Sequence, residues 1–177
     1  MNKPLLGVTL AAMLTSLAGC ADSHQIARTN PNSTVRLSRD DVFFVAVPRD
    51  GAYGSKVYAR SGEMTAGVIV GALARKGARA DRADAYATLP ASLDAARAAG
   101  ATFLVYPTII AWEDRATEWS GKSDVAEVRI EIVSVASGKV ADSVIIKGKS
   151  GWATLGGDHP QDLLPKPIGD YFNALFN

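Results

Sequence analysis

Residues 124–149 have the sequence DVAEVRIEIVSVASGKVADSVIIKGK, and this stretch decides the fold. Its first half alternates apolar and charged side chains, a period of two that predicts a strand with one buried face and one face in water. The pair Ser137-Gly138 predicts a tight turn, after which the apolar pattern resumes. The segment therefore predicts an antiparallel hairpin, with one apolar face made of Val128, Ile130, Ile132, Val140, Val144 and Ile146.

Two upstream segments are apolar almost throughout. They are VFFVAV at 42–47, which is followed by Pro48, and TFLVYPTIIAW at 102–112. Continuous apolar runs predict strands that are buried on both faces. Pro107 cannot donate a backbone hydrogen bond, so we expect a bulge at this residue or the loss of a neighbouring strand. A further short strand is predicted at 78–83.

Helical spacing of apolar residues occurs in three segments. The first has Ser61 as its expected N-cap, and it contains a GxxxG pair, Gly67 and Gly71, that we expect to pack closely on the sheet. The second helix is predicted at 90–100 and the third at 167–176, each with a proline in its first turn.

The predicted element order is β-α-β-α-β-β-β-α. Strands separated by helices predict parallel neighbours joined by right-handed crossovers, and the hairpin adds antiparallel strands to the same sheet. The fold class is therefore α/β, an α+β sandwich in which helices pack on a single mixed sheet within one domain at 39–177. This order is similar to that of the N-terminal domain of the TolB translocation protein, of lipoproteins that activate penicillin-binding proteins, and of the curli secretion lipoprotein.

Residues 1–19 have the pattern of a signal peptide, in which Lys3 precedes an apolar run and then small residues. The run is shorter than the roughly 20 apolar residues of a membrane-spanning helix. The residues Leu17-Ala18-Gly19-Cys20 resemble the lipobox of bacterial lipoproteins. That resemblance implies an S-diacylglycerol and an N-acyl group, such as palmitate, on Cys20. The alternative is an ordinary signal peptide followed by a chance cysteine.

The polar residues 20–38 predict a flexible tether between the lipidated N-terminus and the domain. Ala21, rather than an aspartate, follows Cys20. By resemblance to enteric lipoproteins this favours the outer membrane over the inner membrane, with the domain in the periplasm. Removal of 1–19 leaves 18 Lys and Arg with 18 Asp and Glu. This balance argues against a nucleic-acid partner, and we expect the lipid to hold the protein on the membrane beside an envelope protein partner.

The loop 151–165, GWATLGGDHPQDLLP, is the main candidate for a functional site. As a catalytic loop it would combine Asp158, His159 and Asp162 with carboxylates of another loop, Glu113 and Asp114, since a histidine oriented by an aspartate can act as a general base. As a metal site, it offers fewer ligands than zinc prefers.

A third interpretation makes the same loop a structural connector. Asp158 or His159 would cap a helical turn that begins at Pro160, and Asp162 would lie near the start of that turn. We favour this interpretation, so no catalytic residue, metal or cofactor is expected.

Tryptophans mark the ends of the later strands and are favoured in binding hot spots. The candidate partner-binding residues are therefore Trp112, Trp119, Trp152, Asp158, His159 and Asp162. The alternative is that the tryptophans close the rim of the core.

The segments VYPTIIAWEDRATEWSGKSD (105–124) and KSGWATLGGDHPQDLL (149–164) resemble a family of bacterial lipoproteins that is defined only as a domain of unknown function. The resemblance extends over residues 41–176 and implies no activity. The sequence thus predicts a non-enzymatic, lipid-anchored accessory module of an envelope assembly or transport system. The alternative is a small envelope-polymer hydrolase or carbohydrate-binding protein that uses the 151–165 loop.

Overall fold

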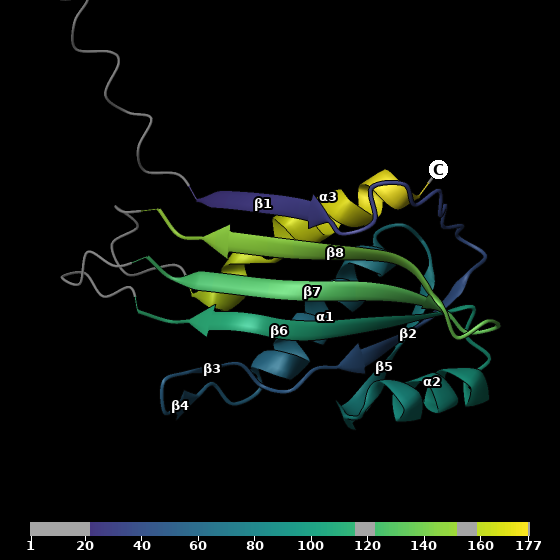
Figure 1. The fold of residues 1–177 in the computed structure, drawn as a ribbon, viewed down its shortest axis with the longest axis horizontal. Coiled ribbons are helices and arrows are strands. Elements are labelled where there is room, and N and C mark those ends of the chain that lie inside the picture. Colours follow the sequence, from purple (N-terminus) through teal and green to yellow (C-terminus); the bar gives the residue numbers. More distant parts are fainter. Residues whose placement is uncertain (1–21, 116–122, 152–158, 177) are drawn as a thin grey trace, which may run out of the picture.

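The structure is a computed structural model that describes residues 22–115, 123–151 and 159–176. In these ranges the chain forms one six-stranded mixed sheet in the order β1-β8-β7-β6-β2-β5, with helices packed on it (Figure 1). The predicted fold class is confirmed. The strands of the sheet are β1 (Ser23–Arg28), β2 (Val42–Val47), β5 (Arg79–Tyr86), β6 (Phe103–Glu113), β7 (Val125–Ser134) and β8 (Val140–Lys149). The remaining elements are the small hairpin β3 (Ala52–Tyr53) and β4 (Lys56–Val57), the helices α1 (Ser61–Ala74), α2 (Leu89–Ala98) and α3 (Pro165–Leu175), and the 3-10 turn η1 (Pro160–Leu163).

The hairpin predicted from the alternating pattern is formed by β7 and β8. The two strands pair antiparallel from Val125 opposite Lys149 to Val133 opposite Val140, and Gly138 in the turn has a φ of 68°. A φ of this sign carries no steric penalty in glycine, which explains the residue at this position. The predicted apolar face is buried except for Val140, whose exposed fraction is 48%. A register shift next to the turn pairs Val140 with Val133, whose side chain belongs to the opposite face, so Val140 does not join Val144 and Ile146.

The parallel part of the sheet also follows the sequence pattern. β2 lies between β5 and β6 and is parallel to both. It pairs with β6 only along Phe103–Val105, so β6 has lost this neighbour at Pro107, where no hydrogen bond could be donated. A register shift follows between Ile109 and Ala111. Both outcomes expected at Pro107 are therefore found within a few residues of it.

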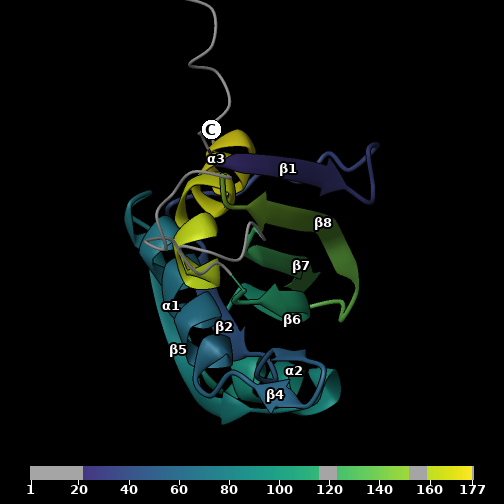
Figure 2. The same cartoon turned by 90° about the vertical axis from the view of Figure 1, so that its left-hand side faces the viewer.

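The helices cover the two faces of the sheet unequally. α1 and α3 lie along one face, and the main core is packed beneath them (Figure 2). α2 packs on the opposite face, where Ala96 meets Leu104 of β6 and Val133 of β7 in a smaller apolar cluster. Among the described elements none covers the rest of that opposite face, over β1, β8 and the adjoining parts of β7 and β6. We call this surface the helix-free face.

The predicted tether is wrong for residues 23–28, which form the edge strand β1. All six residues of β1 pair antiparallel with β8, from Ser23 opposite Lys149 to Arg28 opposite Val144. The chain then returns to the core at Leu37, which is 2% exposed and bridges Phe176. β1 has no apolar pattern in the sequence because nearly all its side chains are exposed, so backbone hydrogen bonds rather than apolar burial hold it.

Two expectations about α1 are also wrong. Ser61 is the first helical residue rather than the N-cap, and the carboxylate of Asp50 accepts the backbone N–H groups of Arg60 and Gly62 instead. Gly67 does not pack on the sheet, since a Cβ at this position would meet nothing within 4 Å. The buried face of α1 is formed by other residues, among them Ala66, Ile69, Ala72 and Leu73. No helix in the described ranges is long and apolar enough to cross a membrane.

Candidate functional site

One end of the sheet is where four neighbouring strands begin or end. β1 starts there at Ser23, β6 ends at Glu113, β7 starts at Val125 and β8 ends at Lys149. The four strand ends lie at the left of Figure 1. We call this end of the sheet, defined by these four residues, the Ser23 end.

Buried polar groups hold the strand ends together at the Ser23 end. Asp124 and Ser150 are both buried, and the backbone N–H of Asp124 donates to Ser150 Oγ at 2.8 Å. The N–H of Ser150 donates to the carbonyl of Asp124 at 3.1 Å, and the N–H of Arg115 donates to the Asp124 carboxylate. The ends of β6, β7 and β8 are therefore fixed by a shared hydrogen-bond network.

The register places two rows of side chains across the four strands on the helix-free face. These side chains point away from the core, because they alternate with Trp112, Ala126 and Ile146, which are buried on the other face. The outer row is Glu113, Val125, Lys149 and Ser23, and the inner row is Ala111, Glu127, Lys147 and Gln25.

A depression of about 470 Å³ lies over these rows. It is lined by Ala111, Glu113, Arg115, Ser123, Val125, Lys147 and Lys149. Lys147 pairs with Glu127 at 3.2 Å, and Arg115 pairs with Glu113. Lys149 has no ion pair within the described ranges. Three cations and one anion line the depression, so its chemistry suits an anionic group.

Sequence reasoning missed this depression. The alternating pattern already placed Lys147 and Lys149 on the face in water, which was an available signal. Their alignment with Arg115 depends on the register shift in β6, and their position beside the start of β1 depends on the pairing of β1 with β8. Neither feature has a sequence signature.

His159 and Asp162 adopt the geometry of the predicted connector. His159 is the N-cap of η1, and its N–H donates to the Asp162 carboxylate at 3.1 Å in a capping box. His159 Nδ1 lies 3.6 Å from Asp114 Oδ1, and the side chain of His159 is 54% exposed. Leu163 and Leu164 are buried, as the connector interpretation requires. Within the described ranges no group of three His, Cys, Asp or Glu side chains could hold a metal ion.

The structure separates the three tryptophans. Trp112 is 1% exposed and belongs to the main core, so as folded here it presents no surface to a partner. The interpretation that it closes the core is the better one, because strand alternation turns it away from the helix-free face. Trp119, Trp152 and Asp158 lie outside the described residues.

A second crevice lies at the carboxyl ends of the parallel strands β2 and β5. It consists of two adjoining hollows of about 280 and 190 Å³ that share Pro48, Arg49, Asp50 and Tyr86. The Arg49 guanidinium lies 4.6 Å from the centre of the Tyr86 ring. Partial burial, followed by the nearby Tyr86, raises the pKa of Tyr106, which lines the smaller hollow. Ligands of open α/β sheets bind at such strand ends, but here Asp50 is already engaged in capping α1.

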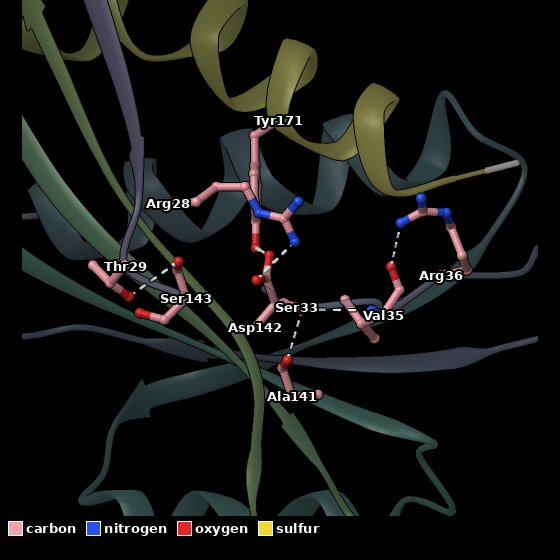
Figure 3. A network of polar contacts seen from close by, with 9 residues as sticks. All are labelled: Arg28, Thr29, Ser33, Val35, Arg36, Ala141, Asp142, Ser143 and Tyr171. Atoms are coloured by element: carbon pink, nitrogen blue, oxygen red, sulfur yellow. Dashed lines mark hydrogen bonds and ion pairs between the residues drawn. The ribbon is translucent and has the colours of Figure 1, made fainter. Parts of the chain in front are cut away.

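A buried polar cluster fastens β1 to the rest of the domain (Figure 3). Asp142 on β8 is fully buried, and its carboxylate accepts hydrogen bonds from Arg28 Nη2 at 2.9 Å and from the Tyr171 hydroxyl at 2.8 Å. Burial, together with this hydrogen bond, raises the pKa of Tyr171. We call Arg28, Asp142 and Tyr171 the β1 clamp, since it joins β1, β8 and α3. Thr29 and Ser33 extend it by donating to the carbonyls of Ser143 and Ala141.

The comparisons with known proteins agree with this architecture. The family described as "Domain of unknown function (DUF4823)" matches residues 35–175. No curated protein matches the chain significantly. Among solved structures, the PelC dodecamer from Paraburkholderia phytofirmans aligns with a TM-score of 0.63 and 18% identity, and covers 83% of this chain and 96% of that chain.

Two further structures are more distant. Lipoprotein GNA1162 from Neisseria meningitidis has a TM-score of 0.48 and 12% identity, over 75% of this chain and 94% of that chain. The C-terminal domain of LpoB from Salmonella enterica has a TM-score of 0.44 and 12% identity, over 63% of this chain and 83% of that chain. At these identities the similarity to PelC is one of fold, and the two lower scores carry no argument.

Proposed function

This chain belongs to the DUF4823 family, and we propose that it is a lipid-anchored lipoprotein of the cell envelope. In this proposal it is a non-enzymatic accessory module of an envelope assembly or transport system. Its domain faces the periplasm from the outer membrane. The observation that carries the proposal is the position of β1, which begins three residues after Cys20 and is built into the sheet.

The anchor is proposed to be a diacylglycerol on the Cys20 sulfur together with an acyl chain on its amino group. A single acyl chain holds a protein on a bilayer only marginally, whereas two or three hold it stably. The β1 clamp supports this role. A strand that directly follows the lipid must withstand any pull between the membrane and the domain, and β1 is held along its whole length by β8 and at Arg28 by Asp142.

Partner binding rather than catalysis is supported by the state of the candidate loop. The Asp162 carboxylate and the N–H of His159 are engaged in capping η1, which ties both residues to the entry of α3. PelC, which shares the fold, is described as a dodecamer, so at least one protein of this architecture works as an assembly. We propose an envelope protein as partner, with Trp119, Trp152, Asp158 and the exposed His159 as its candidate binding residues.

Mass spectrometry of protein purified from the native host tests the anchor. We expect a mature chain that begins at Cys20 and carries a diacylglycerol and an acyl group, and labelled palmitate should be incorporated. Cys20→Ser should abolish incorporation completely, because serine offers no thiol for thioether formation. Ser23→Ala is the matched control and should be labelled like the parent. An unmodified Cys20 thiol, or a mature chain that starts elsewhere, would contradict the anchor.

Photocrosslinking in the native host tests the partner surface. With a crosslinking side chain at position 119 or 152, we expect a discrete adduct with one envelope protein. Position 97 on α2, at the other end of the sheet, is the control and should not give this adduct. If positions 119 and 152 give no adduct under several growth conditions, or if position 97 gives the same adduct, a partner at the candidate binding residues is ruled out.

A further inference from the structure

We infer that the Ser23 end of the helix-free face is a membrane-contact surface that binds anionic lipid headgroups through Arg115, Lys147 and Lys149. This inference deepens the proposed function and rests on the lipid attachment at Cys20. Its ligand is the phosphate-bearing surface of the bilayer, not a free phosphate ion or a protein.

Chain length alone brings these cations to the bilayer. Ser23 is the third residue after Cys20, and an extended chain covers at most about 3.6 Å per residue step, so the two Cα atoms lie within about 11 Å. Ser23 pairs directly with Lys149, and neighbouring strands lie about 4.8 Å apart. The backbone of Lys149 is therefore within about 16 Å of Cys20.

That distance is comparable to the thickness of the membrane surface. The headgroup region on each side of a bilayer is roughly 5–8 Å thick, and the field of anionic lipids extends a further Debye length of about 8 Å. A free tether over 20–38 would have allowed an excursion of about 24 Å and any orientation. Because the sheet already begins at Ser23, only Ala21 and Asp22 lie between Cys20 and β1, and the Ser23 end stays within the reach of the surface field.

The charges at this end favour a phosphate surface. Lysine and arginine donate charge-assisted hydrogen bonds to phosphate oxygens, and basic residues beside a membrane are drawn to anionic lipids. The depression presents Arg115, Lys147 and Lys149 together in about 470 Å³. Lys149, which pairs with Ser23 at the start of β1, has no ion pair within the described ranges.

The anions around the depression are engaged locally. Glu127 pairs with Lys147, and Glu113 pairs with Arg115. The Asp22 carboxylate accepts the N–H of Gly151 at 3.0 Å. Lys149, in the outer row at the end of the sheet, therefore keeps a positive charge that none of these anions neutralises. The surface nearest to the anchor is therefore also the part of the depression best suited to an anion.

Vesicle flotation of the unlipidated chain tests the surface without the anchor. Residues 21–177 retain every element of the described fold. We expect this chain to float with vesicles of phosphatidylcholine containing 30% phosphatidylglycerol, and not with pure phosphatidylcholine. The double substitution Lys147→Gln and Lys149→Gln should weaken partitioning about tenfold. Added salt at 0.5 M should have a similar effect, because it screens the surface charge.

The matched control removes two cations at the other end of the sheet, by Arg97→Gln and Lys139→Gln, and should leave partitioning unchanged. Three results would overturn the inference. They are equal flotation with both vesicle types, equal flotation of the two double variants, and no flotation at all. Cys20 could be lipidated while the unlipidated chain ignores anionic vesicles, in which case this inference fails and the anchor stands. If the unlipidated chain floats with anionic vesicles but Cys20 is unmodified in the host, the lipid-binding surface stands and the anchor fails.

Discussion

An Asp142→Ala variant of residues 21–177 is expected to lose about 3–5 kcal/mol of unfolding free energy relative to the parent chain. Asp142 is fully buried, and its carboxylate accepts hydrogen bonds from both Arg28 and Tyr171. Alanine would leave the Tyr171 hydroxyl buried without its acceptor and the Arg28 guanidinium, which is about a third exposed, without its partner. Removing one member of a buried pair is costly for this reason. Urea unfolding followed by circular dichroism gives the difference.

Tyr171→Phe is the matched control for the β1 clamp. It removes one hydrogen bond but leaves the ion pair between Arg28 and Asp142, so we expect a loss of about 1–2 kcal/mol. Asp142→Ala should also expose β1 to proteolysis near Arg28, since the clamp joins that strand to α3. A loss below about 1 kcal/mol for Asp142→Ala would mean that backbone pairing with β8 alone holds β1, and that the clamp does not reinforce the anchor.

The elements that could be predicted from the sequence are those whose burial leaves a periodic trace. The alternation in β7, the continuous apolar runs of β2 and β6 and the helical spacing of α3 each record contact with the core. β1 leaves no such trace, because an edge strand with exposed side chains looks like a polar linker. β1 is therefore held by backbone pairing with β8, and the pattern of its side chains does not predict that pairing.

The site shows the same division. Local chain chemistry predicts that Asp158 or His159 caps the turn and that Asp162 lies near its start; the structure gives the cap to His159, with Asp162 as its partner in the capping box. The depression depends on which residues of β6, β7 and β8 lie opposite one another, and a slip of one residue would turn Lys147 and Lys149 into the core. A sequence shows that these lysines lie on a face in water. It does not show that this face meets the chain end that carries Cys20.

A Trp112→Ala variant should lose about 3–5 kcal/mol of unfolding free energy, as other large buried aromatic residues do. Trp112 is 1% exposed and belongs to the main core. It also packs against the backbone of Gly51, where any added Cβ would overlap the Trp112 side chain. Truncation would therefore leave a cavity between β6 and the β3–β4 hairpin. Thermal unfolding and urea unfolding of residues 21–177 measure the loss.

A surface aromatic residue provides the comparison that separates core packing from partner binding. Tyr53 is 45% exposed and lies beneath the Arg115 guanidinium, so Tyr53→Ala should cost no more than about 1 kcal/mol. If Trp112 were instead part of a binding platform, its truncation would leave stability near that of Tyr53→Ala and would abolish the crosslinked adduct from positions 119 and 152. Burial predicts the opposite. Compared with Trp112→Ala, the Trp112→Phe variant should recover more than half of the lost unfolding free energy, because the phenyl ring refills most of the core. It should also preserve the crosslinked adduct, because the surface is unchanged.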